Sequence, residues 1–145
     1  MNREVKDFLI ITTFIIDIFL FWILFTQSLN LFDSFVAYSA IILHFFLYLF
    51  INLNEDTDLL HLFFTFYVSI FPFFVTNFYL LLLLLGLVLL MLAGWIINEK
   101  CIWGNFGSYP TVQKFSEKII YFSYSLIFLV IGVSLYKLKK QLSKN

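Results

Sequence analysis

The sequence predicts an all-α fold, an integral membrane bundle of five transmembrane helices. Of its 145 residues, 62% are hydrophobic and 12% are charged, whereas about a quarter of the residues in a soluble domain are charged. The mean hydropathy is +0.96, and several apolar runs reach the roughly 17–25 residues that cross a bilayer. No Lys or Arg occurs between Lys6 and Lys100. These observations place residues 1–145 in a single membrane domain.

The first predicted span covers residues 8–29. Its length and its lack of a small-x-small cleavage site predict a retained helix, not a cleaved signal peptide. The sequence NLFDS at 30–34 predicts a turn, in which Asp33 or Ser34 caps the next helix by accepting a backbone N–H. The second span covers residues 35–53 and ends at the polar sequence NEDTD, residues 54–58.

The third and fourth spans come from a long uncharged stretch, residues 59–98. One helix of that length would measure about 60 Å, whereas the hydrocarbon layer is about 30 Å thick. We therefore predict a hairpin that turns at VTNFY, residues 75–79, with spans at 59–75 and 78–98. Pro72 is expected to end or kink the third span because it has no N–H to donate.

Residues 99–117 are predicted to form an interfacial loop, rich in the aromatic residues typical of a membrane surface, and the fifth span covers residues 118–136. Five spans put residues 99–117 on the same face as the N-terminus and opposite the C-terminus. The alternative is four spans with a re-entrant segment at 59–75, which puts both termini on one face. The basic tail YKLKKQLSKN is interpreted as a topology signal and a contact with anionic lipid.

Asp17 is the most informative polar residue, because it interrupts the apolar run TTFIIDIFLFW at 12–22. A carboxylate at mid-helix costs about 2.5–3.5 kcal/mol on insertion scales, so such residues usually face a protein interior or a water-filled cavity. Asp17 and His44 are each about the tenth residue of their spans, so antiparallel packing brings them to one depth. We predict an intramembrane polar pair, Asp17 with His44, that titrates as one unit.

Three interpretations of this pair remain open. The pair sets the register of two helices, or it lies on a proton or ion pathway, or a protonated Asp17 bonds locally instead. Ser125 on the fifth span is the next candidate partner for Asp17.

Small residues at helical spacing predict the faces on which helices approach closely. In the second span, a stripe of Ala37, Ala40, His44 and Tyr48 follows i, i+3 and i+4 spacing. Six small residues are predicted to pack helices together: Ala37 and Ala40 in the second span, Gly86 and Ala93 in the fourth, Ser125 and Gly132 in the fifth.

Several function classes lack the residues they need. A haem between His44 and His61 is disfavoured, because their different distances from the span ends separate them by almost 10 Å in depth. The single cysteine, Cys101, and two histidines make no zinc-ligand spacing. No basic patch favours nucleic acid, and no catalytic motif favours an enzyme. We expect no cofactor and no metal.

The stretch GWIINEKCIWG at 94–104 resembles the helix-end Asn-x-x-Cys sequence of certain small uncharacterised multi-helix membrane proteins, some encoded by large DNA viruses. Asn98 and Cys101 occupy the two matching positions, whereas Gly94 stands where a histidine would precede Trp95. The resemblance implies a multi-helix membrane fold and carries no function with it.

The function expected from the sequence is that of a multi-pass membrane protein of structural or assembly type. Its expected partners are the lipid bilayer and either further copies of the chain or other membrane proteins. The alternative is a small oligomeric transporter, or an ion- or proton-conducting protein, that uses Asp17 and His44.

Overall fold

The computed structural model describes residues 3–53, 58–98 and 110–143, and these residues form an all-α fold. The elements in chain order are α1 (Arg3–Thr26), α2 (Leu31–Leu53), α3 (Asp58–Ile70), the 3₁₀ turn η1 (Phe71–Phe73), α4 (Phe78–Asn98) and α5 (Pro110–Leu142). The predicted fold class, all-α with five helices, is confirmed for this part of the chain.

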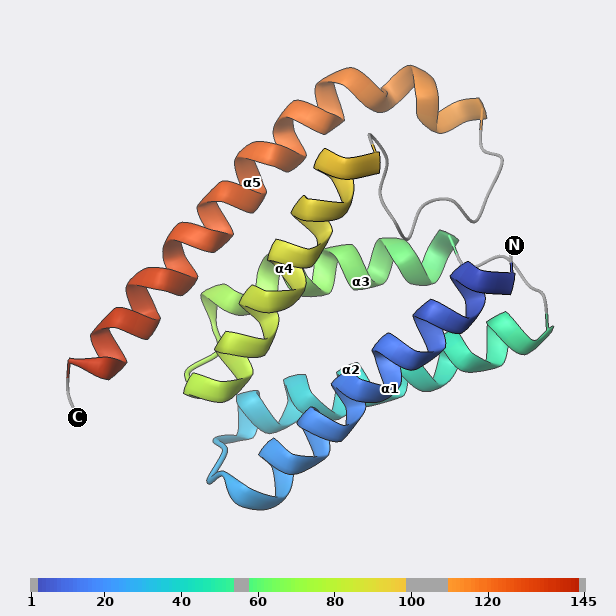
Figure 1. Cartoon of the computed structure of the whole chain (residues 1–145). Coiled ribbons are helices and arrows are strands. Elements are labelled where there is room, and N and C mark those ends of the chain that lie inside the picture. Colours follow the sequence, from blue (N-terminus) through green and yellow to red (C-terminus); the bar gives the residue numbers. More distant parts are fainter. Residues whose placement is uncertain (1–2, 54–57, 99–109, 144–145) are drawn as a thin grey trace.

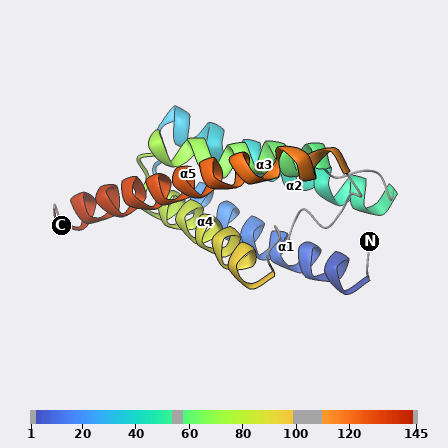
Figure 2. The ribbon, with the colours of Figure 1, turned by 90° about the horizontal axis from the view of Figure 1, so that it is seen from above.

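Successive helices run in alternating directions between two ends of the molecule (Figure 1). The N-terminus and the start of α3 lie at one end. The C-terminus, the α1–α2 connection and the start of α4 lie at the other end, which we call the C-terminal end. Seen from above, α1 and α4 lie on one side, and α2, α3 and α5 on the other (Figure 2). The antiparallel pair α1–α2 follows from its connection, residues 27–30, which is too short for any other arrangement.

The residue that caps the start of α2 is Asn30, not Asp33 or Ser34 as predicted. The side-chain oxygen of Asn30 accepts the backbone N–H of Asp33 at 2.8 Å, and its amide donates to the Asp33 carboxylate at 3.1 Å. This reciprocal arrangement satisfies a backbone N–H that has no partner inside the first turn. Because Asn30 takes the capping position, the Asp33 carboxylate is available for contacts elsewhere.

The third predicted span, 59–75, is divided in the structure. The α-helix α3 ends at Ile70, and Pro72 lies in the 3₁₀ turn that follows. The prediction that Pro72 ends this helix is confirmed. With 13 residues in α3 and 3 in η1, the two elements together reach about 25 Å. Asn77 then caps α4, since its side-chain oxygen accepts the N–H of Leu80 at 3.0 Å.

The last helix is longer than the predicted span 118–136. Helix α5 has 33 residues and starts at Pro110, so residues 110–117 are helical and not part of a loop. Proline suits a first helical turn, where its missing N–H would have no partner. Residues 99–109, with Cys101, lie outside the described part of the chain.

One described helical stretch, Leu31–Phe50 in α2, is long and apolar enough to cross a membrane. Two further apolar stretches, Ile10–Thr26 and Phe78–Leu90, are shorter than such a crossing requires. Of the described helices, one could therefore cross a membrane by its length and composition.

The core is aliphatic and lies between all five helices. It includes Leu20 from α1, Val36 from α2, Val68 from α3, Leu81 from α4 and Val130 from α5, each at most 1% exposed. Outside this core, large apolar side chains on every helix face outwards, and Phe25 and Leu31 reach 85% and 89% exposure.

The predicted packing residues divide into two groups. Ala37 and Ala40 are buried, at 0% and 8% exposure. Gly86, Ala93 and Gly132 are exposed, and a Cβ built on either glycine would meet no heavy atom within 4 Å. In the described part of the chain these three positions lie outside the buried core, where branched residues such as Leu85, Val88 and Val130 pack instead. Their role in packing helices together stays a prediction. The side chain of Ser125 lies outside the described residues.

Candidate functional site

The contact between α1 and α2 buries a row of polar side chains. On α1, Thr13, Asp17 and Leu20 share one buried face by i, i+3 and i+4 spacing. On α2, Ala40 and His44 lie on the face that meets this row. Alanine at position 40 lets the two helices approach closely next to the larger imidazole.

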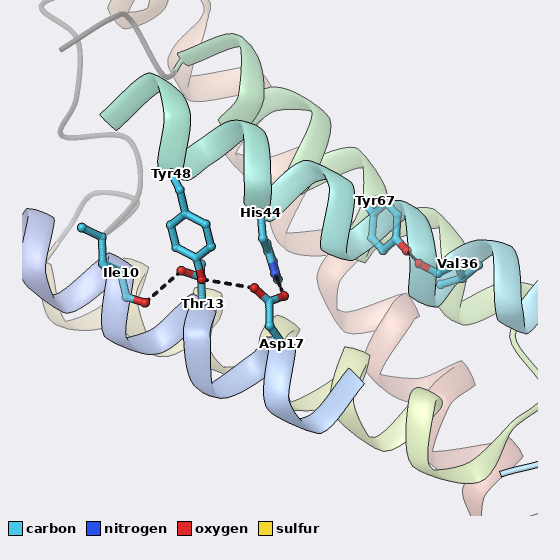
Figure 3. Close-up of polar contacts among 7 residues, drawn as sticks. All are labelled: Ile10, Thr13, Asp17, Val36, His44, Tyr48 and Tyr67. Atoms are coloured by element: carbon cyan, nitrogen blue, oxygen red, sulfur yellow. Dashed lines mark hydrogen bonds and ion pairs between the residues drawn. The ribbon is translucent and has the colours of Figure 1, made fainter. Parts of the chain in front are cut away.

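Asp17 and His44 lie in direct contact (Figure 3). The His44 Nδ1 and the Asp17 Oδ1 are 2.5 Å apart, and the two side chains are 2% and 13% exposed. A contact this short between buried groups is typical of a charge-assisted hydrogen bond. The arrangement can hold one proton between a carboxylate and an imidazole, away from bulk water.

Tyr48, one turn beyond His44 on α2, provides a second donor. Its hydroxyl donates to the Asp17 Oδ2 at 3.1 Å, so both carboxyl oxygens take part in a hydrogen bond. Thr13, one turn before Asp17 on α1, donates to the carbonyl of Ile10 at 3.2 Å. The i, i+4 stripe in the sequence contains Tyr48 and predicts a packing face, but its spacing gives no indication that Tyr48 donates a hydrogen bond to Asp17.

The other nitrogen of His44, Nε2, is buried and has no hydrogen-bond partner among the described residues. The imidazole packs against the ring of Phe64 on α3, with 5.8 Å between ring centroids. It also lines a cavity of about 10 Å³ that is enclosed mainly by aliphatic side chains of α1 and α4.

Tyr67 on α3 reaches α2 one to two turns from His44 (Figure 3). Its hydroxyl donates to the carbonyl oxygen of Val36 and lies 3.2 Å from the hydroxyl of Ser39. Tyr67 also lines the cavity beside His44. No sequence pattern indicated this residue, because a tyrosine in an aromatic-rich helix has no distinguishing spacing.

A second polar group gathers around Asp33 at the C-terminal end. The carboxylate is 1% exposed and accepts the backbone N–H of Thr76 at 3.0 Å, the backbone N–H of Asn77 at 2.9 Å and the Thr76 hydroxyl at 2.7 Å. Asn30 also donates to the Thr76 hydroxyl, at 2.7 Å. A residue of α2 thus satisfies the donors that precede α4, and it places a negative charge at the positive end of that helix.

Lys137 of α5 binds the carbonyls on the other side of the same turn. Its Nζ donates to the carbonyl oxygens of Pro72, Phe73 and Val75 at 3.0, 2.6 and 3.0 Å. The Gln141 amide donates to the carbonyl oxygen of Thr76. Partial burial lowers the pKa of Lys137 from its ordinary value, and the charge of Asp33 opposes that shift. The basic tail therefore has a structural role that its charge alone did not indicate.

The side chain of His61 and the whole of Cys101 lie outside the described residues. Within those residues, no group of three His, Cys, Asp or Glu side chains is placed to bind a metal ion.

Comparison with protein-family models, with curated proteins and with solved structures finds no match to this chain. The resemblance at 94–104 therefore stays a prediction.

Proposed function

We propose that the protein is a small multi-pass integral membrane protein of structural or assembly type, which acts through contacts between its helices and those of other copies or other membrane proteins. The observation that carries this proposal is the apolar surface. Phe14, Trp22, Phe45, Phe66 and Phe128 are all between 44% and 63% exposed, on four different helices. Soluble monomers rarely expose apolar patches of more than a few hundred Å².

Five crossings, at about 8–29, 35–53, 59–75, 78–98 and 118–136, fit the alternation of helix directions (Figure 1). The reach of α3 with η1, about 25 Å, is close to the hydrocarbon thickness of about 30 Å. The polar turns at 27–30 and 74–77 lie at the same end as the C-terminus. In this arrangement Asp17 and His44 lie near mid-membrane, and each shields the charge of the other from lipid.

The interior supports a structural role over a catalytic one. The buried polar side chains bond between helices: Asp17 contacts His44, Tyr67 binds a backbone carbonyl of α2, and Asp33 accepts a backbone N–H from the turn before α4. These bonds hold the helices in place. The cavity beside His44, at about 10 Å³, is far smaller than the roughly 300–1,000 Å³ of a small-molecule site. We propose no enzymatic activity and no cofactor.

Photo-crosslinking in the native membrane tests the assembly role. A photoreactive amino acid at exposed positions such as Phe19 or Phe45 should give protein adducts at some of them, and the buried neighbour Leu20 should give none. The protein should also stay in the membrane pellet after carbonate extraction. Adducts with lipid alone at every exposed position would contradict assembly, and release by carbonate would contradict membrane integration.

A second candidate function is proton conduction, which the 2.5 Å contact between Asp17 and His44 favours. A buried carboxylate and imidazole in contact are typical of proton relays in membrane proteins. Proteoliposomes with the purified protein should then dissipate a pH gradient, and Asp17→Asn should abolish the flux. The absence of flux with the wild-type protein would eliminate this candidate and leave the structural role.

A further inference from the structure

Two separate sets of hydrogen bonds follow α2 through the interior. The first set joins Tyr48, Asp17 and His44, and the second joins Tyr67 to Ser39 and to the carbonyl of Val36. Between the two sets lies the cavity of about 10 Å³, and both His44 and Tyr67 line it. A residue of each set therefore lines the same small space.

The two polar residues that line this mainly apolar space match one water molecule. The Nε2 of His44 is buried without a partner among the described residues, and a buried polar atom left unpaired costs free energy. Since Nδ1 faces Asp17, the Nε2 at the other side of the ring is directed away from α1. The Tyr67 hydroxyl donates its hydrogen bond to the carbonyl oxygen of Val36, so the Tyr67 oxygen can still accept a hydrogen bond.

The size of the cavity excludes larger ligands. A water molecule needs about 10–15 Å³ of probe-occupied space and at least two polar partners, and this cavity is at that lower limit. The described residues around it supply no third metal-ligating side chain. An apolar guest would leave Nε2 unpaired.

We propose that His44 Nε2 and the Tyr67 hydroxyl bind one water molecule in this cavity. The water joins the two sets into one line of hydrogen bonds, from Tyr48 through Asp17, His44 and Tyr67 to Ser39. It donates to the Tyr67 oxygen, and at Nε2 it donates to a neutral imidazole or accepts from a protonated one. The line connects α1, α2 and α3 by polar contacts inside an apolar core, and it does not depend on the assembly role proposed above.

Water-edited solid-state NMR of the protein in lipid bilayers tests this site directly. The chain has two histidines, so selective His labelling gives two ring signals, and His61→Gln assigns them. At short mixing times the His44 ring should receive magnetisation from water, several-fold more than labelled Leu20, which is 1% exposed. A His44 signal no stronger than that of Leu20 would show a dry cavity and overturn the proposal.

Two variants locate the water. Ala40→Leu fills the cavity from its wall and should remove most of the water signal at His44, whereas Ala93→Leu, at an exposed position, should leave it unchanged. Tyr67→Phe adds no bulk, so it tests the site even if Ala40→Leu fails to fold. It should lower the signal at least two-fold while the bond from His44 to Asp17 persists. An unchanged signal in Tyr67→Phe would overturn the assignment of Tyr67 as the second partner.

Discussion

At the scale of single residues, the protein stabilises each of two buried carboxylates with hydrogen bonds from other parts of the chain. Asp17 shares a hydrogen bond with His44 and accepts one from Tyr48, and Asp33 accepts hydrogen bonds from Asn30, Thr76 and Asn77. A buried ionised group without such partners would cost several kcal/mol. In both cases the partners come mainly from another helix or turn, so the hydrogen bonds that stabilise the carboxylate also hold two elements together.

A double-mutant cycle on Asp17 and His44 should show strong coupling. Asp17→Leu should lower the free energy of unfolding by about 3 kcal/mol, because it leaves the buried imidazole without its acceptor. The double variant Asp17→Leu/His44→Phe should be more stable than Asp17→Leu alone. Asp17→Asn keeps an acceptor and should cost about 1 kcal/mol. The measurement is unfolding in mixed detergent micelles. Losses that add up in the double variant would mean that the two residues do not interact.

At the scale of elements, the ends of the helices are held by side chains from other helices. The turn between η1 and α4 has its N–H groups bound by Asp33 of α2 and its carbonyls bound by Lys137 of α5. Within the turn itself, one residue caps α4: the side-chain oxygen of Asn77 accepts the N–H of Leu80. The hairpin of α3 and α4 is therefore stabilised by contacts that are distant in sequence.

Asp33→Asn should destabilise the start of α4. The amide can accept fewer hydrogen bonds than the carboxylate and carries no charge to favour the helix N-terminus, so the expected cost is about 1–3 kcal/mol. Hydrogen–deuterium exchange should show the loss at the first turn of α4, while α1 keeps its protection. The matched control is Asp7→Asn, at an exposed position near the other end. Equal effects of the two substitutions on α4 would contradict the role of Asp33.

Lys137→Met should have a larger effect than Lys139→Met, although the two lysines are two residues apart. Lys137 donates three hydrogen bonds to backbone carbonyls, whereas Lys139 is exposed. The expected loss is about 1–2 kcal/mol for Lys137→Met and below about 0.5 kcal/mol for Lys139→Met. Thermal unfolding in detergent measures both. Similar stability of the two variants would show that the three contacts contribute little.

At the scale of the whole molecule, a small core is surrounded by a large apolar surface, and polar groups collect at the C-terminal end. At that end, Asn30 donates to the Thr76 hydroxyl, and Lys137 and Gln141 of α5 donate to backbone carbonyls of the turn before α4. Apolar sides with a polar end are what a bilayer requires of an embedded bundle, and the same sides would suit contacts with other membrane helices.

The five-span topology predicts that the N-terminus and the C-terminus lie on opposite faces of the membrane. In sealed vesicles an impermeant maleimide should label either a cysteine at Asn2→Cys or a cysteine at Ser143→Cys, each in a Cys101→Ser background, but not both. Labelling after permeabilisation by detergent serves as the control for reactivity. Both cysteines labelled from one side would favour the alternative of four spans with a re-entrant segment at 59–75.

The sequence by itself determined the class of fold and the general position of each helix. Composition and the lengths of uncharged runs require apolar helices, and Pro72 ends α3 because of its own covalent structure. The equal depth of Asp17 and His44 could be inferred as well, since antiparallel neighbours with a short connection match residues by their distance from the helix ends. These properties depend on local chemistry and on counting residues.

The tertiary structure alone decided which partners meet across the bundle. Which way α4 and α5 face could not be read from Gly86, Ala93 or Gly132, because a small residue serves equally well on an outer surface, and the aliphatic residues of α4 have almost no periodicity. The contacts of Asp33 with Thr76, and of Lys137 with the turn before α4, join residues more than 40 positions apart. Such contacts depend on the rotation and the packing of whole helices, and these are determined by the summed fit of many side chains in the core.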